Sequence, residues 1–168
     1  MIPDTVPARA TQARSDRLWI WAALTLQLLG YAVDVVWHGL VNPGVEPTTV
    51  SEMARHLLTV HALLYLGAAC VLLAILRAVA HRARRSGVPV APHAAGAGAL
   101  VVALGGALLS AGAEAWHEYA HLQLDTHKAP IAGGLSLVGY LVAVGAAIVE
   151  GRRAGRRGSE TLSRRRAA

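Results

Sequence analysis

The chain alternates between long apolar stretches and short polar segments. The apolar stretches cover residues 18–40, 57–80, 94–115 and 131–149. Each is close to the roughly 20 residues that an α-helix needs to cross about 30 Å of hydrocarbon. The pattern therefore predicts an all-α fold, an integral membrane bundle of four helices, whose domain of residues 18–149 is flanked by two polar tails.

The composition favours a membrane protein over a soluble domain. Of the 168 residues, 54% are hydrophobic and only 15% are charged, which is more apolar surface than one small soluble core would bury. Residues 1–17 are polar, and the apolar stretch after them is longer than the core of a signal peptide, so we expect the first span to be a true membrane helix. We expect both polar tails, residues 1–17 and 150–168, to be disordered.

The basic residues are distributed unevenly along the chain. Of the 16 Lys and Arg residues, all but Arg55 and Lys128 lie before the first span, between the last turn of the second span (Arg77) and the start of the third, or after the fourth. By the positive-inside rule, both termini and the middle loop face the cytoplasm. We therefore predict a multi-pass protein of the plasma (cell inner) membrane whose basic segments lie near anionic lipid rather than nucleic acid. Its first partner is the lipid bilayer, and the pattern is compatible with other membrane subunits or a homo-oligomer.

Polar residues inside the spans gather toward the predicted outer face. In the first span, Asp34 and His38 are four residues apart, so they share one face of the helix. A carboxylate that faces lipid is costly, so this face should point into the bundle. From this pair alone, a ligand role and a role as a polar contact between helices are equally open.

Two further histidines stand at the start of the second span. His56 and His61 are five residues apart, which is about 140° around a straight α-helix. We therefore do not expect them to share one ligand position. His61 lies about one turn deeper and is the stronger candidate for the interior, whereas a solvated interface would also explain His56.

The third span ends in the sequence EAWHEYAHLQLDTH, residues 114–127. Spacings of three and four residues along a continued helix place one carboxylate and two imidazoles on one side of it. This row is Glu114, His117 and His121, with Glu118 beside it and Asp125 and His127 as expected loop residues.

Three separate helices thus bring histidine and carboxylate to the same membrane depth. Such convergence is costly unless the charges are paired or bind a cation. We therefore predict a metal site, and a ligand set of imidazole and carboxylate without cysteine favours copper(II), zinc(II) or iron(II) over copper(I). The predicted ligands are Asp34, His38, His61, Glu114, His117 and His121, with His56 and Glu118 as weaker candidates.

The fourth span has a different character. It contributes only Ser136 and Tyr140 as polar groups, so we expect it to close the bundle without supplying ligands. Glycines in the third and fourth spans should allow those helices to approach closely; they are Gly96, Gly98, Gly105, Gly106, Gly133, Gly134, Gly139 and Gly145.

The stretch DVVWH, residues 34–38, resembles the copper-site motif in the C subunit of the copper-dependent membrane methane and ammonia monooxygenases. In that family an Asp, a His four residues later and a further His about thirteen residues on hold a copper ion within the membrane. Asp34 and His38 match this pattern, whereas the third position falls on Ser51, and His56 lies five residues beyond it. The resemblance covers some 25 of the 168 residues and implies copper chemistry at this site.

Three functions are open at this point. The first is a metal centre that serves oxidation, electron transfer or metal handling, with enzymatic activity undecided because the sequence shows no substrate path. The second is an accessory or assembly subunit of a larger membrane complex, in which the histidines and carboxylates form a structural or proton-responsive network. The third is a haem b protein with two of His38, His61 and His117 as axial ligands.

Overall fold

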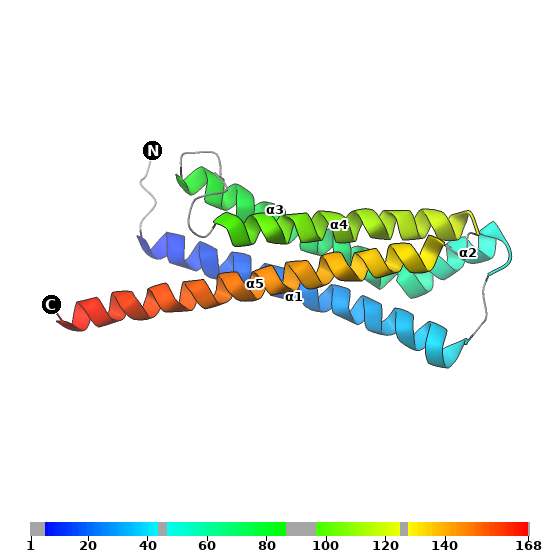
Figure 1. The fold of residues 1–168 in the computed structure, drawn as a ribbon, viewed down its shortest axis with the longest axis horizontal. Coiled ribbons are helices and arrows are strands. Elements are labelled where there is room, and N and C mark those ends of the chain that lie inside the picture. Colours follow the sequence, from blue (N-terminus) through cyan, green and yellow to red (C-terminus); the bar gives the residue numbers. More distant parts are fainter. Residues whose placement is uncertain (1–5, 44–46, 87–96, 125–127, 168) are drawn as a thin grey trace.

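The computed structural model describes residues 6–43, 47–86, 97–124 and 128–167, most of which form helices (Figure 1). No strand occurs among these residues. The elements in chain order are α1 (Val6–Val36), η1 (Trp37–Val41), α2 (Val50–His56), η2 (Leu57–His61), α3 (Ala62–Ser86), α4 (Ala97–Leu122) and α5 (Lys128–Ala167). The two η elements are short π-helical segments: η1 continues α1, and η2 joins α2 to α3.

Four helices are long and apolar enough to cross a membrane. They cover Thr11–Val41, Val50–Arg84, Gly98–Leu122 and Lys128–Arg156. The all-α fold and its four membrane-length helices are therefore confirmed. Many of the side chains that face outward are apolar, and Leu40 and Leu58 are 78% and 77% exposed. This exterior indicates a multi-pass membrane protein.

The second membrane-length helix begins before the apolar stretch that predicted it. The Thr49 hydroxyl accepts a hydrogen bond from the backbone N–H of Glu52 at 3.3 Å, and Glu52 Oε2 accepts one from the backbone N–H of Thr48 at 3.2 Å. This cap satisfies donors that a helix start leaves unpaired. Because the helix starts at Val50, His56 is held on regular helix.

Helix also continues beyond the predicted membrane domain at both ends. It covers residues 6–17 in α1 and residues 150–167 in α5, segments that we expected to be disordered. In α5, alanine, arginine and glutamate favour helix and no proline interrupts them. In α1, the buried Asp16 packs against α3, with its Oδ1 atom 2.9 Å from Nδ1 of His81.

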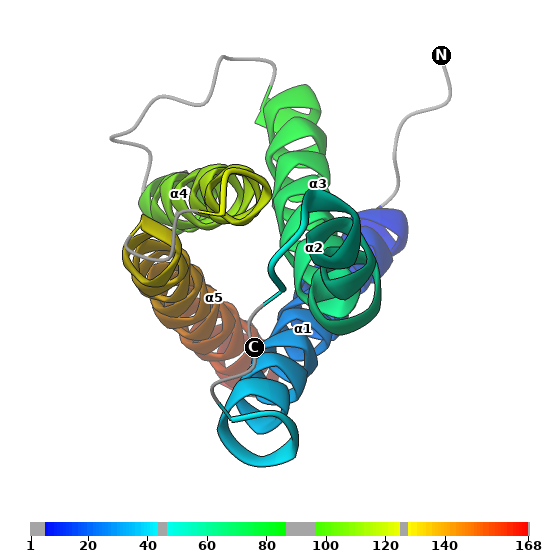
Figure 2. The same cartoon turned by 90° about the vertical axis from the view of Figure 1, so that its right-hand side faces the viewer.

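The helices pack as two pairs, α1 with α3 and α4 with α5, and the pairs meet mainly along α3 and α4 (Figure 2). Glycine allows the closest approach within each pair. A Cβ atom added to Gly30 would lie 2.4 Å from Cα of Leu64, and one added to Gly106 would lie 2.7 Å from the carbonyl oxygen of Gly139. Of the eight glycines predicted to allow close approach, Gly106 and Gly139 do so, whereas Gly98, Gly105, Gly134 and Gly145 face no atom within 4 Å and Gly96 lies outside the described residues. The approach between α1 and α3 was not predicted.

The interior of the bundle changes character along its length. In the middle of the bundle the core is apolar and includes Leu24, Ile75 and Ala143. From there toward the end that holds η1 and η2, buried side chains are polar, among them Gln27, His61, Ser110, Glu114 and Ser136. Polar groups surrounded by lipid must be satisfied inside the bundle, so this half is where a functional site is expected.

Candidate metal centre

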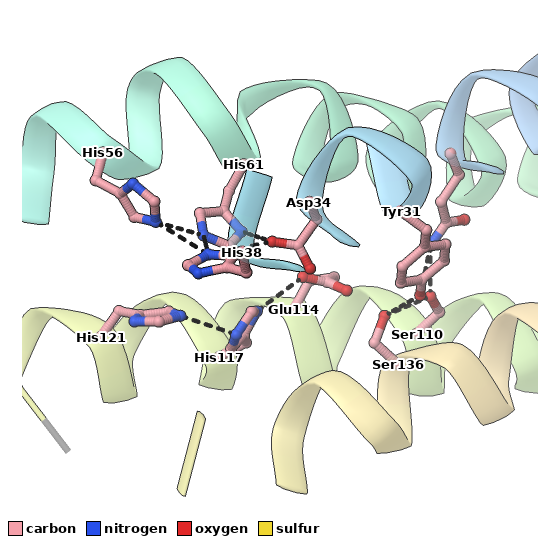
Figure 3. A network of polar contacts seen from close by, with 11 residues as sticks. Tyr31, Asp34, His38, His56, His61, Ser110, Glu114, His117, His121 and Ser136 are labelled. Carbon is pink, nitrogen blue, oxygen red and sulfur yellow. Dashed lines mark hydrogen bonds and ion pairs between the residues drawn. The ribbon is translucent and has the colours of Figure 1, made fainter. Parts of the chain in front are cut away.

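Five histidines from three parts of the chain meet at one end of the bundle (Figure 3). His38 lies in η1, His56 ends α2, His61 ends η2, and His117 and His121 lie near the end of α4. His38 is half-buried and the other four are buried. We call this end of the bundle the histidine end.

His38, His56 and His61 form a compact triangle of nitrogen atoms, which we call the histidine triad. Their Nε2 atoms are 3.0 Å apart between His56 and His61, 3.3 Å between His38 and His56, and 3.5 Å between His38 and His61. In the part of the chain that the structure describes, this is the group whose potential ligand atoms all lie within 4.8 Å of one another. The three imidazoles therefore converge on a common centre.

A π-helical turn explains how His56 and His61 meet. We expected the two side chains to point apart, because residues five apart diverge by about 140° on a straight α-helix. The segment η2, Leu57–His61, is instead π-helical, and its wider turn pairs residues five apart. The expectation that the two side chains point apart is therefore wrong, and His56 is a central member of the triad.

His117 and His121 form a second group on α4, which we call the α4 pair. Their Nε2 atoms are 2.9 Å apart. The α4 pair faces the triad, because the ring of His61 has its centroid 5.4 Å from that of His117 and 5.2 Å from that of His121. The spacing of four residues predicted their common face, and the packing of the helices brings that face against the triad.

Each histidine group has a carboxylate behind it. Asp34 Oδ1 lies 3.1 Å from Nδ1 of His61 and 3.6 Å from Nε2 of His38, and Glu114 Oε2 lies 3.5 Å from Nδ1 of His117. The negative charge of a carboxylate near Nδ1 favours a proton on that nitrogen, which leaves the Nε2 lone pair available to a metal ion.

The carboxylates are close to the imidazoles but poorly satisfied. Among the described residues, neither oxygen of Glu114 has a hydrogen-bond partner of good geometry, although this side chain is only 3% exposed. The same holds for Asp34 Oδ1 and for the Nδ1 atoms that face the two acids. Buried carboxylates without hydrogen bonds are costly, so a cation at the histidine end would stabilise the arrangement.

A second polar layer lies deeper in the bundle. The Tyr31 hydroxyl is 2.6 Å from Ser136 Oγ, and Gln27 donates from Nε2 to Ser110 Oγ at 2.7 Å. The two serine hydroxyls are 3.1 Å apart. The layer thus ties α1, α4 and α5 together beneath the carboxylates, and α5 contributes Ser136 to it without contributing to the histidine cluster.

Tyr65 also lies against the site, and the sequence analysis did not identify it. Its ring stacks on that of His61, with centroids 5.9 Å apart and planes inclined by 17°. Its hydroxyl is buried and has no hydrogen-bond partner among the described residues. Tyr65 stands four residues after His61, so helical spacing carried the signal that could have found it.

A pocket of about 510 Å³ opens beside the histidines. The residues that line it are Asp34, His38, Pro47, Thr48, Met53, His61, His117, His121, Leu124, Ala129 and Pro130. A concave site with a few converging polar groups among apolar ones is typical of small-molecule binding. A small molecule in this pocket would contact members of both histidine groups.

The remaining candidates lie elsewhere. Glu118 is exposed, because one residue after His117 the helix has turned by about 100°. Asp125 and His127 lie outside the described residues. His81 is at the opposite end of the bundle, beside Asp16. Of the two weaker ligand candidates, only His56 joins the cluster.

Comparison with known proteins adds no relative. No protein-family model, no curated protein and no solved structure matches the chain. The chemistry of the histidine end is therefore inferred from its own donor atoms, distances and burial.

Proposed function

We propose that the histidine triad binds a transition metal ion within the membrane bundle. The observation that carries this proposal is the spacing of the three Nε2 atoms, which are 3.0, 3.3 and 3.5 Å apart. In a tetrahedral site with metal–nitrogen bonds of about 2.0–2.1 Å, neighbouring nitrogens are about 3.3–3.4 Å apart. The triad thus offers three ligands at tetrahedral spacing and leaves a fourth position open.

The surroundings of the triad support a bound ion. The carboxylate of Asp34 lies 3.1 Å from Nδ1 of His61, and its negative charge favours a cation at the opposite nitrogen of that imidazole. The apolar residues Met53, Leu57 and Val60 are buried on α2 and η2, the same segments that carry His56 and His61. An apolar shell of this kind limits access of water and strengthens the interaction between a cation and its ligands.

The open position and the adjoining pocket favour a reactive centre over a structural one. Structural zinc sites are closed by four protein ligands, whereas catalytic sites keep a position for water or substrate. Here His38 and His61 both line the pocket of about 510 Å³. Among oxidation, electron transfer and metal handling, we therefore propose oxidation of a small molecule that reaches the metal through this pocket, near the extracytoplasmic face.

The donor atoms limit the choice of metal. Imidazole ligands suit zinc, copper and iron, and no cysteine belongs to the cluster. The resemblance of Asp34 and His38 to the copper-site motif of the membrane monooxygenases makes copper the first ion to test. In this chain the third ligand place belongs to His56, because Ser51 is exposed on α2.

The geometry is less suited to haem b. Two axial nitrogens stand on opposite sides of an iron, about 4 Å apart, with the porphyrin plane between them. The Nε2 atoms of His38 and His61 are 3.5 Å apart, and Nε2 of His56 lies 3.3 Å from the first and 3.0 Å from the second. The imidazole of His56 thus occupies space that a porphyrin ring between the other two would need. A bare ion fits this space.

The second candidate function is a metal-free network in an accessory subunit. It is favoured by the deeper layer of Gln27, Tyr31, Ser110 and Ser136, which links three helices through side-chain hydrogen bonds and needs no ion. The protein would then use its histidines as polar contacts between helices. The two functions differ in whether the purified protein binds metal.

Metal binding by purified protein is the decisive experiment. The full chain is extracted in a mild detergent, stripped with a chelator and titrated with copper(II), zinc(II) and iron(II), and metal content and the visible spectrum are recorded. Tight binding of one of these ions without a Soret band supports the proposal. A Soret band would support haem, and absence of any tight ion would support the accessory network.

Variants then locate the ion. His38→Ala or His56→Ala should weaken binding at least tenfold, because each removes one of three ligands. His81→Ala is the matched control, since His81 lies at the opposite end of the bundle, and it should keep wild-type affinity. Equal losses in all three variants, with each still folded, would refute the placement of the ion in the triad.

A further inference from the structure

We propose that the α4 pair, His117 and His121, is a second metal position, so that the histidine end holds a dinuclear centre. This inference rests on the proposed function of the triad and goes beyond it in the number of ions and in the ligands of the second one. The sequence analysis predicted a single metal site with six ligands, whereas here the α4 pair binds a separate ion.

The two histidine groups are too far apart to serve one ion. Two nitrogens bound to the same metal are at most about 4.2 Å apart, twice a bond of about 2.0–2.1 Å. Among the described residues, the group within 4.8 Å contains only the triad, and neither His117 nor His121 completes it. The rings of the α4 pair lie 5.2–5.4 Å from that of His61, but the ring of His121 lies 6.4 Å from that of His56, centroid to centroid, so an ion held by all three triad nitrogens is not shared with the α4 pair. Because the triad and the α4 pair face each other, one ion bound by each group fits this arrangement.

The α4 pair has the geometry of a chelate by itself. Two histidines four residues apart on a helix are a recurring zinc-binding arrangement. Their Nε2 atoms are 2.9 Å apart, which matches two adjacent ligands at a right angle with bonds of about 2.0–2.1 Å. This nitrogen–nitrogen distance is shorter than those of the triad, 3.0–3.5 Å. A right angle between ligands is typical of coordination by more than four ligands, so the second ion would have several open positions.

The carboxylates repeat one pattern on both sides. Asp34 faces Nδ1 of His61 in the triad at 3.1 Å, and Glu114 faces Nδ1 of His117 in the α4 pair at 3.5 Å. In each case the opposite nitrogen, Nε2, points into the cluster (Figure 3). A carboxylate beside Nδ1 is a common neighbour of a metal-binding histidine, and the structure contains this placement twice, each time without a hydrogen bond between the two groups.

Glu114 supplies the independent reason for a second cation. Its side chain is 3% exposed, and neither oxygen has a hydrogen-bond partner among the described residues. An ionised carboxylate so placed requires a positive charge nearby. An ion on the α4 pair lies on the same helix face as Glu114, whereas an ion in the triad stands beside Asp34.

The pocket lies beside both positions. It is lined by His38 and His61 from the triad and by His117 and His121 from the α4 pair. A small ligand with an oxygen or nitrogen donor could therefore contact both ions. We assign this pocket as the place where such a ligand binds the centre.

Counting bound ions tests the inference. Chelator-stripped full-length protein in detergent is saturated with copper(II), passed through a desalting column, and analysed for copper per chain and for its electron paramagnetic resonance signal. We expect two ions per chain and a signal altered by coupling between neighbouring ions. One ion per chain would overturn the dinuclear centre and leave the proposed function standing, whereas no ion would refute both.

Variants assign the two positions. His38→Ala and His121→Ala should each retain one ion with an uncoupled signal, and His81→Ala should retain both. Glu114→Gln keeps the shape of the side chain and should weaken only the second ion, by about 10–100-fold. If the wild type binds two ions without coupling, or if His121→Ala still binds two, the second ion lies elsewhere and the inference is wrong.

Discussion

The packing of Gly30 against α3 gives a sharp prediction, because the ligands of the triad are divided between the two helices that meet there. In the substitution Gly30→Ala, the new Cβ atom would lie 2.4 Å from Cα and 2.6 Å from the backbone nitrogen of Leu64. These are backbone atoms and cannot rotate away. Carbon atoms pack best at about 3.5–4.0 Å, so the helices must separate by about 1 Å at this point.

That separation should reach the metal site. His38 lies on η1, the continuation of α1, whereas His56 and His61 lie on α2 and η2, which lead into α3. The distances from His38 to His56 and to His61 should therefore widen, while the distance between His56 and His61 should not. A metal site of this kind tolerates displacements of its ligand atoms of only about 0.5 Å. We therefore expect Gly30→Ala to lower metal affinity at least tenfold, or about 1.4 kcal/mol, although Gly30 is not itself a proposed ligand.

The assay is competition with a chelator on protein that elutes as a single species from gel filtration. Gly112→Ala is the first control, because a Cβ there meets nothing within 4 Å. Gly106→Ala is the second control. Its Cβ would lie 2.7 Å from the carbonyl oxygen of Gly139 on α5, so it disturbs the packing of α4 against a helix that supplies no ligand. It should lower thermal stability but leave the affinity of the triad near wild type. Wild-type affinity in folded Gly30→Ala, or an equal loss in Gly106→Ala, would refute the reasoning.

Three further outcomes are expected. Asp34→Asn should weaken metal binding by about 10–100-fold and keep the fold, because the amide still forms polar contacts but no longer carries charge; unchanged affinity, measured by the same competition, would remove Asp34 from the centre. Bound metal should be released as the pH is lowered into the range where imidazole takes up protons, because protons compete for Nε2; retention of metal at low pH, followed by elemental analysis, would argue against histidine ligands. The variant Lys128→Cys should react with an impermeant maleimide from outside the cell while tags at both termini stay cytoplasmic; a C-terminal tag exposed outside would contradict the orientation.

The chain's own sequence determined the number of membrane-length helices and most of the candidate ligands. Whether a segment can span a membrane depends on its length and apolar content, which are local properties. The rows Asp34 with His38 and Glu114 with His117 and His121 follow from the α-helical period alone. The cap at Thr49 likewise rests on a local motif, a threonine three residues before a glutamate.

Only the tertiary structure decided which rows meet and in what register. The approach of α1 to α3 at Gly30 brings His38 beside His56 and His61, and no local pattern specifies such a contact between distant segments. The π-helical turn η2 could not be predicted either, because its hydrogen bonds span only one residue more than those of an α-helix and no proline or glycine marks its sequence. Ser136 became part of the polar layer through the packing of α5. The helical period places a side chain on a face of its own helix, but the partner of that face is chosen by packing between helices.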